Sequence, residues 1–171
     1  MSEVQLGEKV AIVTGASEGI GAALSRRLNA QGVRVVLVAR RVEPLEALVK
    51  TLNAEVPHLI FRADVSDDER MQALVEATLN AFGRIDILVN NAGIGTLPDF
   101  EEEDESGWDE MLSVNAKSIW LGIKSVVSIM KSQQSGSIVN VSSIFGASGG
   151  FGKSSSYHAS KGAVSALTRN A

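Results

Sequence analysis

The chain has 171 residues, of which 44% are hydrophobic and 21% are charged, and its net charge is −4 at pH 7. This length and composition predict a single folded domain over residues 1–171 and exclude a disordered chain. The acidic balance and the lack of a long basic run argue against nucleic acid as a partner.

Several chemistries are excluded by residue types that are missing or isolated. The chain has no cysteine, which rules out disulfides, iron–sulfur clusters and cysteine catalysis. Its two histidines, His58 and His158, lie far apart without neighbours at metal-ligand spacing, so we expect no metal site. The polar start lacks a signal-peptide core, and no apolar stretch approaches the ~18 residues of a membrane helix. We therefore expect a cytoplasmic protein that does not contact membranes.

In the first part of the chain, short apolar runs alternate with helical patterns. Residues 10–13 form a continuous apolar run, which predicts a strand, and residues 19–31 show the fourfold spacing of a helix. A second buried strand is predicted over residues 33–39. Leu45, Leu48, Val49 and Leu52 then follow the i, i+3, i+4, i+7 pattern of an amphipathic helix that Pro44 opens, and residues 59–63 predict a third strand.

The same alternation continues to the end of the chain. Ser66 and Glu69 have the spacing of a capping box, in which Ser66 begins a helix that reaches Phe82. Beyond it the pattern predicts a strand, a long helix, a strand and a last helix, at residues 85–90, 105–130, 137–141 and from about Ser156.

Apolar strands separated by helices imply a parallel sheet with both faces covered. With right-handed crossovers, the predicted fold is a doubly wound α/β (Rossmann) sheet with strand order 3-2-1-4-5. Ligands of such sheets bind beyond the carboxyl ends of the strands, so the residues that follow each strand are the candidates for chemistry. The acidic stretch 99–105 is interpreted as a solvated loop whose carboxylates favour the start of the next helix.

After the first strand, residues 14–21 read TGASEGIG. Three glycines allow a sharp turn and a close approach of the backbone to a ligand, directly before a helix N-terminus that favours a pyrophosphate. The alternative is a tight strand–helix turn without a ligand. The position of the glycine motif directly after the first strand favours a dinucleotide site.

The end of the second strand bears on the choice of nucleotide. Sites for NAD usually carry an acid there for the ribose, whereas an arginine suits a 2′-phosphate. This chain has Arg40 and Arg41 and no acid before Glu43. We therefore favour NADP(H), with Arg40 as the main contact and Arg41 as support, and NAD(H) remains open. The missing acid also argues against an S-adenosylmethionine site.

Tyr157 and Lys161 lie at i, i+4, on one face of the last predicted helix. A tyrosine hydroxyl is a poor base at neutral pH, and a nearby ammonium favours its ionised form, so the pair is a candidate general acid/base. Such a pair also occurs by chance. Other polar residues close the fourth and fifth strands or lie in the middle of the long helix: Asn90, Asn91, Ser142, Ser143 and Asn115.

Taken together, these motifs resemble those of the short-chain dehydrogenase/reductase family. TGASEGIG, VLVARR, Asp64-Val65, NNAG, SVNAKS, IVNVSS and YHASK occur in the order found in that family and cover nearly the whole chain. The resemblance implies an oxidoreductase that moves hydride between NADP(H) or NAD(H) and a carbonyl or secondary alcohol. The 3-oxoacyl reductases and related alcohol dehydrogenases of the family share these motifs.

The resemblance also implies roles for individual residues. Tyr157 is the expected proton donor and acceptor, Lys161 holds the nicotinamide ribose, Ser143 binds the substrate oxygen, and Asn115 orders a proton relay. Asp64 and Val65 are expected to flank the adenine. The remaining cofactor contacts are expected from Gly15, Ser17, Glu18, Gly19, Ile20, Gly21, Asn91, Ala92 and Gly93.

The chain departs from the family pattern at three places. Glu18 stands where relatives that prefer NADP often carry a basic residue. The interval from Ser143 to Tyr157 is one residue longer than in many relatives, which keeps Ser142 open as the functional serine. The chain ends at Ala171, inside the predicted catalytic helix, whereas relatives continue through two more strands and a substrate lid. We therefore expect an incomplete piece of a longer enzyme, with weakened cofactor binding and turnover.

Two further expectations concern partners and function. Substrate contacts are expected from Phe145, Phe151 and His158, although packing roles are equally open to them. The broad apolar face of helix 105–130 predicts a homo-oligomer, a dimer or tetramer. The alternative to an enzyme is a non-catalytic nucleotide-binding protein, such as a redox sensor or an assembly subunit.

Overall fold

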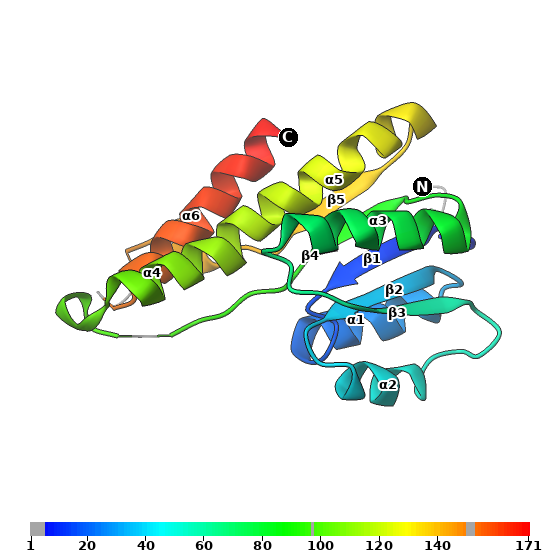
Figure 1. Cartoon of the computed structure of the whole chain (residues 1–171), viewed down its shortest axis with the longest axis horizontal. Helices are drawn as coiled ribbons and strands as arrows, with labels where there is room; N and C mark the ends of the chain where they lie inside the picture. The colour runs from blue at the N-terminus through cyan, green and yellow to red at the C-terminus, as the bar shows by residue number, and fades with distance from the viewer. Residues whose placement is uncertain (1–5, 97, 150–152) are drawn as a thin grey trace.

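The computed structural model describes residues 6–96, 98–149 and 153–171. Its centre is a parallel five-stranded sheet with the order β3-β2-β1-β4-β5, which confirms the predicted topology (Figure 1). The strands are β1 (Val10–Thr14), β2 (Arg34–Ala39), β3 (His58–Arg62), β4 (Ile87–Asn90) and β5 (Ser137–Asn140).

The burial of each strand follows from its place in the sheet. Every residue of β1 is buried, as are all but the first of β2, because both strands have neighbours on two sides and helices on two faces. Ala11 of β1 pairs with Val35 of β2 and with Ile87 of β4. β5 lies at an edge of the sheet and is partly exposed, and Val139 keeps 47% of its surface accessible.

The helices form one layer on each face of the sheet (Figure 1). Alternate side chains of the strands divide between two cores. One core joins the sheet to α3 and α5, and the other joins it to α1 and α2. The helices outside the 105–133 region are α1 (Gly19–Asn29), α2 (Glu43–Val49), α3 (Asp68–Phe82) and α6 (Ser155–Asn170).

The predicted capping box is wrong by one residue. Asp67, not Ser66, is the N-cap of α3, and its side chain accepts a hydrogen bond from the Arg70 backbone N–H at 3.1 Å. The Ser66 hydroxyl instead donates to Asp64 at 2.6 Å. The Ser66 hydroxyl is therefore engaged in a tight turn around the Asp64 carboxylate, and Asp67 caps the helix in its place.

The long helix predicted over residues 105–130 is interrupted. It consists of α4 (Glu105–Leu112), a π-helical turn η2 (Ser113–Lys117) and α5 (Ser118–Gln133). Asn115 lies in the middle of the π-helical turn and is fully buried. Turns of this kind are uncommon and often occur at functional sites, which accounts for an asparagine inside a helix.

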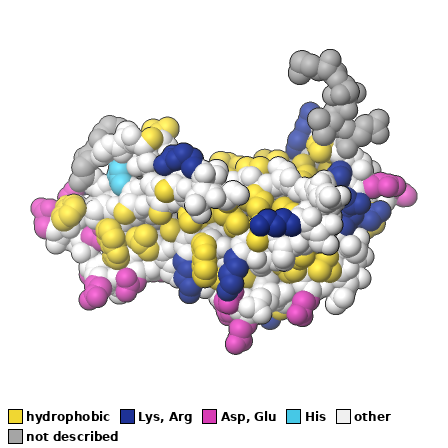
Figure 2. All heavy atoms as spheres, turned by 90° about the horizontal axis from the view of Figure 1, so that it is seen from above, with side chains coloured by type: hydrophobic (Ala, Val, Ile, Leu, Met, Phe, Trp, Pro, Cys, Tyr) yellow, Lys and Arg dark blue, Asp and Glu magenta, His cyan; other side chains and the backbone are white. Residues whose placement is uncertain are grey.

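The edge at β5 is bordered by an apolar groove of about 540 Å³ between α5, β5 and α6. Ile123, Val127, Met130 and Ile138 line it. Seen from above, the molecule carries hydrophobic side chains across its middle (Figure 2). Within the described residues, no helix is both long and apolar enough to cross a membrane.

Candidate active site

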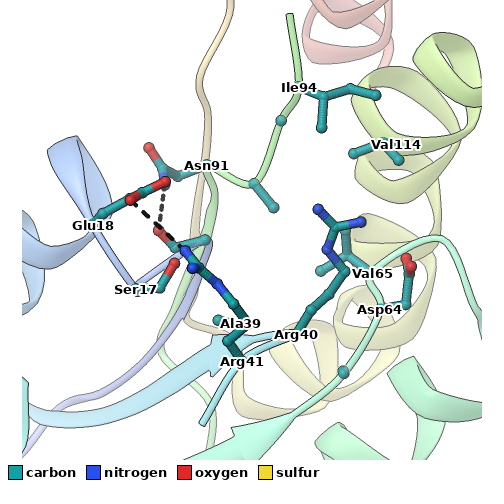
Figure 3. A pocket seen from close by; sticks show the side chains of 14 residues that line it. Ser17, Glu18, Ala39, Arg40, Arg41, Asp64, Val65, Asn91, Ile94 and Val114 are labelled. Carbon is teal, nitrogen blue, oxygen red and sulfur yellow. Dashed lines mark hydrogen bonds and ion pairs between the residues drawn. The ribbon is translucent and has the colours of Figure 1, made fainter. Parts of the chain in front are cut away.

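The carboxyl ends of the strands surround a cavity of about 250 Å³ (Figure 3). The loops after β1, β2, β3 and β4 all contribute to its wall, as the doubly wound topology predicts. Ten predicted cofactor residues line it: Gly15, Ser17, Glu18, Arg40, Arg41, Asp64, Val65, Asn91, Ala92 and Gly93. These ten residues therefore share one cavity, and their contact with a cofactor stays a prediction.

The glycine turn after β1 is built for close packing. Gly15 has φ +64°, and a Cβ placed there would lie 2.8 Å from the Ala92 Cα. A Cβ on Gly21 would lie 2.3 Å from the Gly15 carbonyl oxygen, so a side chain at either place would force the turn apart. Gly19 differs, because its φ is +54° and the space around it is open. Neither Gly19 nor Gly21 lines the cavity itself.

The first turn of α1 follows this glycine turn. Glu18 is its N-cap, but the Glu18 side chain makes no capping hydrogen bond. The opening N–H groups and the positive end of the helix dipole are therefore available to an anion.

The ends of β1 and β4 are tied together beneath the cavity. The Thr14 hydroxyl accepts hydrogen bonds from the backbone N–H groups of Asn91 at 3.0 Å and of Ala92 at 3.1 Å. The Asn91 amide donates to the carbonyl oxygens of Thr14 at 3.0 Å and of Gly15 at 3.2 Å. These bonds fix the NNAG segment against the glycine turn and hold the floor of the cavity in place.

Two arginines after β2 lie differently in the cavity. Figure 3 shows Arg41 directed toward Glu18, with which it forms an exposed ion pair at 3.9 Å, while Arg40 lies on the side of Val65 and Asp64. Hydrogen bonds from the Ser66 hydroxyl and backbone N–H hold the pKa of Asp64 below its usual value, and the charge of Arg40 adds to this effect. Asp64 is therefore a carboxylate at neutral pH.

A second hollow of about 510 Å³ adjoins the first, and Asn91, Gly93 and Ile94 line both. Tyr157 and Lys161 of α6 line the second hollow, opposite Ile20. The sequence-predicted pair therefore faces the same space as the predicted cofactor segment.

Lys161 is held beside Tyr157 in a desolvated position. Its ammonium donates to the Val141 carbonyl oxygen at 3.0 Å and lies 5.7 Å from the centre of the Tyr157 ring. Burial lowers the pKa of Lys161, because the charged form loses hydration.

Asn115 connects the loop after β4 with α6. Its side chain pairs with the backbone of Ile94, accepting from the N–H at 2.8 Å and donating to the carbonyl oxygen at 2.9 Å. The same amide donates to the Ser160 hydroxyl at 3.2 Å. Asn115 does not line either cavity, so its position is that of a connector between the NNAG loop and the helix of Tyr157.

The two serines after β5 make different bonds. Ser142 lines the second hollow, and its hydroxyl donates to the Lys161 carbonyl oxygen at 3.0 Å. Ser143 caps the short 3₁₀ helix η3 (Ile144–Gly146) by accepting from the Phe145 N–H at 3.3 Å. Ser143 is not among the residues that line the hollow.

The aromatic residues predicted at the mouth of the site form a cluster. Phe145 lines the hollow and stands edge-on to Tyr157, with ring centres 6.3 Å apart. His158 stacks on Phe145 at 4.8 Å, and its Nδ1 is 2.8 Å from the Ser154 carbonyl oxygen. Packing therefore accounts for His158. Phe151 lies outside the described residues.

Sequence reasoning missed several cavity residues, namely Ala39, Ala63, Ile94 and Val114. Ala39 is the last residue of β2, and Ala63 directly follows β3, so their places at strand ends were the available signal. Val114 belongs to the SVNAKS motif, whose asparagine drew attention instead.

The acidic stretch after residue 98 is only partly the solvated loop that was expected. Asp104 caps α4 by accepting from the Gly107 N–H at 2.7 Å, as carboxylates before a helix do. The Glu103 carboxylate, however, is hydrogen-bonded to Ser155 and Ser156 of α6. In the described part of the chain, no group of three or more acidic or histidine side chains is arranged to hold a metal ion.

Comparison with known proteins agrees with this geometry. The short chain dehydrogenase family matches residues 9–171. An uncharacterised oxidoreductase of Staphylococcus saprophyticus is 40% identical over 171 residues, which cover 97% of this chain and 71% of that protein. Levodione reductase of Leifsonia aquatica is 40% identical over 169 residues, covering 95% of this chain and 62% of the reductase.

Solved structures give the same result. A crystal structure of levodione reductase matches with a TM-score of 0.92 and 38% identity, over 96% of this chain and 65% of that one. A short-chain dehydrogenase/reductase from Burkholderia phymatum in complex with NAD matches with a TM-score of 0.93 and 33% identity, over 98% and 60%. The chain thus spans about two thirds of the proteins it matches, and it belongs to the short-chain dehydrogenase family.

Proposed function

We propose that this protein moves hydride between a nicotinamide dinucleotide and a carbonyl or secondary alcohol. The observation that carries the proposal is the shared wall of the two cavities. Asn91, Gly93 and Ile94 border both the cavity at the strand ends and the hollow that contains Tyr157 and Lys161. A dinucleotide held by the residues of the first cavity would therefore lie next to the space that contains Tyr157 and Lys161.

The residues at the strand ends fit a dinucleotide. The Gly15 and Gly21 positions leave no room for a side chain, and the open space at Gly19 lies beside the uncapped start of α1. A pyrophosphate at this place accepts hydrogen bonds from the free N–H groups of the first turn. Asp64 and Val65, at the far side of the cavity, are the proposed adenine contacts.

We favour NADP(H) over NAD(H). The end of β2 has no acid to bind a ribose hydroxyl, and Arg40 lies in the cavity with a planar guanidinium suited to a phosphate. The ion pair of Arg41 with Glu18 at 3.9 Å offsets the repulsion that Glu18 exerts on a phosphate. The Burkholderia relative was crystallised with NAD, so NAD(H) is the competing cofactor.

The proposed chemistry divides between cofactor and protein. A bound nicotinamide supplies or accepts the hydride. The Tyr157 hydroxyl gives a proton to the substrate oxygen in reduction and takes it back in oxidation, while the Lys161 ammonium stabilises the ionised tyrosine and holds the ribose.

Ser143 is the proposed donor to the substrate oxygen. Its hydroxyl accepts from Phe145, whereas the Ser142 hydroxyl already donates to the Lys161 carbonyl oxygen. Among the described residues the Ser143 hydroxyl donates to no protein group, which leaves its hydrogen for a developing negative charge. Asn115 orders the proton path between the NNAG loop and α6. We further propose that the protein acts as a homo-oligomer.

Tyr157→Phe tests this function. The substitution removes only the hydroxyl, so we expect ketone-dependent oxidation of the dinucleotide to fall by at least about 100-fold, the usual contribution of a positioned acid or base. Cofactor affinity, followed by nicotinamide fluorescence, should stay within about twofold, because ring packing against Phe145 is retained.

Phe145→Leu is the complementary variant, since it alters the aromatic contact that Tyr157→Phe retains and removes no proton donor. Unchanged turnover in Tyr157→Phe would contradict the assigned role. Cofactor binding without turnover in the unmodified chain would support a non-catalytic nucleotide-binding protein instead.

A further inference from the structure

Helix α6, which carries Tyr157, begins without a cap of its own. Its N-cap residue, Ser154, is fully buried with φ +59° and ψ 64°, and the Ser154 side chain makes no capping hydrogen bond. Non-glycine residues adopt this left-handed conformation only where the surrounding structure holds them in it. The start of the helix therefore depends on contacts from elsewhere in the chain.

Glu103 supplies those contacts from 53 residues earlier in the chain. One carboxylate oxygen accepts from the Ser155 hydroxyl and from the Ser156 backbone N–H, the latter at 3.1 Å, and the other oxygen accepts from the Ser156 hydroxyl. Ser156 itself is fully buried. A single carboxylate thus satisfies one free N–H of the helix and fixes two side chains of its first turn.

The protonation state of Glu103 suits this role. Burial raises the pKa of Glu103, but the hydrogen bonds from Ser155 and Ser156 outweigh it, and the net pKa lies below the usual value for Glu. The carboxylate is therefore charged at neutral pH, where it also interacts favourably with the positive end of the α6 dipole.

The segment that carries Glu103 is fixed to the same region at other points. The Ser154 N–H donates to the Pro98 carbonyl oxygen at 2.8 Å, and Lys153 pairs with Asp99 at 2.9 Å. Earlier in this segment Gly95 lies against the Tyr157 ring, since a Cβ placed there would be 3.5 Å from a ring carbon. The segment therefore forms a wall of the substrate hollow and also braces the helix of Tyr157.

We propose that Glu103 is a positioning residue: its carboxylate holds the first turn of α6, so that the Tyr157 hydroxyl meets the substrate oxygen. The proposal rests on the proposed oxidoreductase function. Tyr157 directly follows the two serines that Glu103 binds, so release of the turn displaces the reacting hydroxyl. A misplacement of about 1 Å can cost about 100-fold in rate.

The test compares Glu103→Ala and Glu103→Gln with Glu101→Gln, a matched control on the adjacent, exposed 3₁₀ turn η1 (Phe100–Glu102). At a temperature well below melting, we expect Glu103→Ala to lower kcat by about 10-fold to about 100-fold. The NADPH dissociation constant should change by less than about twofold, because the cofactor cavity does not include Glu103. Glu103→Gln keeps one acceptor oxygen, so its kcat should fall less than that of Glu103→Ala.

A double-mutant cycle with Ser156→Ala adds a readout that a general loss of stability would not give. Ser156→Ala should lower kcat in the unmodified chain and have little further effect in Glu103→Ala, because the two groups act through one contact. Additive losses, or a kcat for Glu103→Ala within about twofold of the unmodified chain, would overturn the proposal.

Amide hydrogen exchange at Ser156 and Tyr157 separates this proposal from the proposed function. We expect faster exchange at both amides in Glu103→Ala and no change in Glu101→Gln. If exchange at the Ser156 and Tyr157 amides is unchanged in Glu103→Ala, the positioning role is overturned, even where the unmodified chain shows turnover. An unmodified chain that shows no turnover, together with faster exchange in Glu103→Ala, overturns the proposed function and leaves the contact with α6 established.

Discussion

At the scale of single residues, the most informative contrast is between Arg40 and Arg41. They are neighbours in sequence, yet Arg41 is paired with Glu18 at 3.9 Å while Arg40 lies on the side of Asp64 and Val65. Both partners of the Arg41 pair are largely exposed, so the pair itself contributes little to stability. Its effect is on the charge presented to a ligand, because it partly neutralises the acid nearest the glycine turn.

This arrangement predicts different consequences for the two substitutions. Arg40→Ala should raise the NADPH dissociation constant by about 10-fold to about 100-fold, because one charge-assisted hydrogen bond contributes about 1.5–3 kcal/mol. NADH binding should change little. Arg41→Ala is the control and should raise the NADPH dissociation constant less than Arg40→Ala does. It removes only the supporting contact and leaves the charge of Glu18 unpaired. Fluorescence titration checks both, and equal losses for NADPH and NADH would contradict the role of Arg40.

Most residues that the sequence placed in the cavity are glycines or polar residues, whereas the missed ones are apolar. Glycines and polar residues that follow a strand can be recognised within a few positions, and eight of the ten predicted cavity residues are of this kind. Glu103 gave no such signal, because its partners Ser155 and Ser156 lie more than 50 residues away. Contacts of this kind depend on the path of a loop, which residue spacing does not encode.

At the scale of elements, apolar runs predicted all five strands and their order, because buried parallel strands carry continuous hydrophobic residues. The helix starts were predicted to within one residue, but one helix cap was misplaced. Asp67 rather than Ser66 caps α3, since Asp64 binds the serine first. The π-helical turn at Ser113–Lys117 was not predicted, because hydrogen-bond registers of four and five residues have similar side-chain patterns.

The amino ends of β1 and β4 are joined by a buried carboxylate that the sequence did not reveal. Asp86 is 3% exposed on its side chain and accepts from Arg84 at 2.6 Å, from Lys9 at 3.1 Å and from the Val10 N–H at 3.0 Å. Burial raises the pKa of Asp86, but these hydrogen bonds outweigh it and hold the pKa below the usual 3.8. The charged form therefore stabilises the fold.

Asp86→Asn should lower the free energy of unfolding at pH 7 by about 1–3 kcal/mol, as expected for lost hydrogen bonds to a charged group. Because the folded pKa is depressed, this stabilisation is fully present above the unfolded value of 3.8 and is lost as pH falls through the folded pKa. The difference between the two chains in urea denaturation should therefore shrink on acidification below pH 3.8.

Asp68→Asn is the comparison, because Asp68 is 44% exposed and pairs with Lys124 at 3.4 Å on the surface. Its effect at pH 7 should stay below about 1 kcal/mol. If Asp68→Asn lowered the free energy of unfolding as much as Asp86→Asn does, burial of the carboxylate would not explain the contribution of Asp86 to stability.

At the scale of the whole molecule, the sheet brings the cavity at the strand ends and the hollow with Tyr157 and Lys161 to one edge. The shared residues Asn91, Gly93 and Ile94 make these two spaces continuous. The sequence predicted this edge because the topology fixes where strand ends meet. The sequence favoured Ser143 over Ser142 as the functional serine, whereas Ser142 is the one that lines the hollow, because the path of the loop after β5 decides which serine faces it.

The measurement that tests the central claim most directly is a titration of the chain with NADPH and with NADH, followed by nicotinamide fluorescence. We predict saturable binding of NADPH that is tighter than that of NADH, because Arg40 lies where a 2′-phosphate is expected. Tighter binding of NADH would contradict the cofactor assignment and favour Glu18 as the deciding residue. Absence of binding by either dinucleotide would contradict the claim that this sheet edge, as the chain builds it, forms a nicotinamide site.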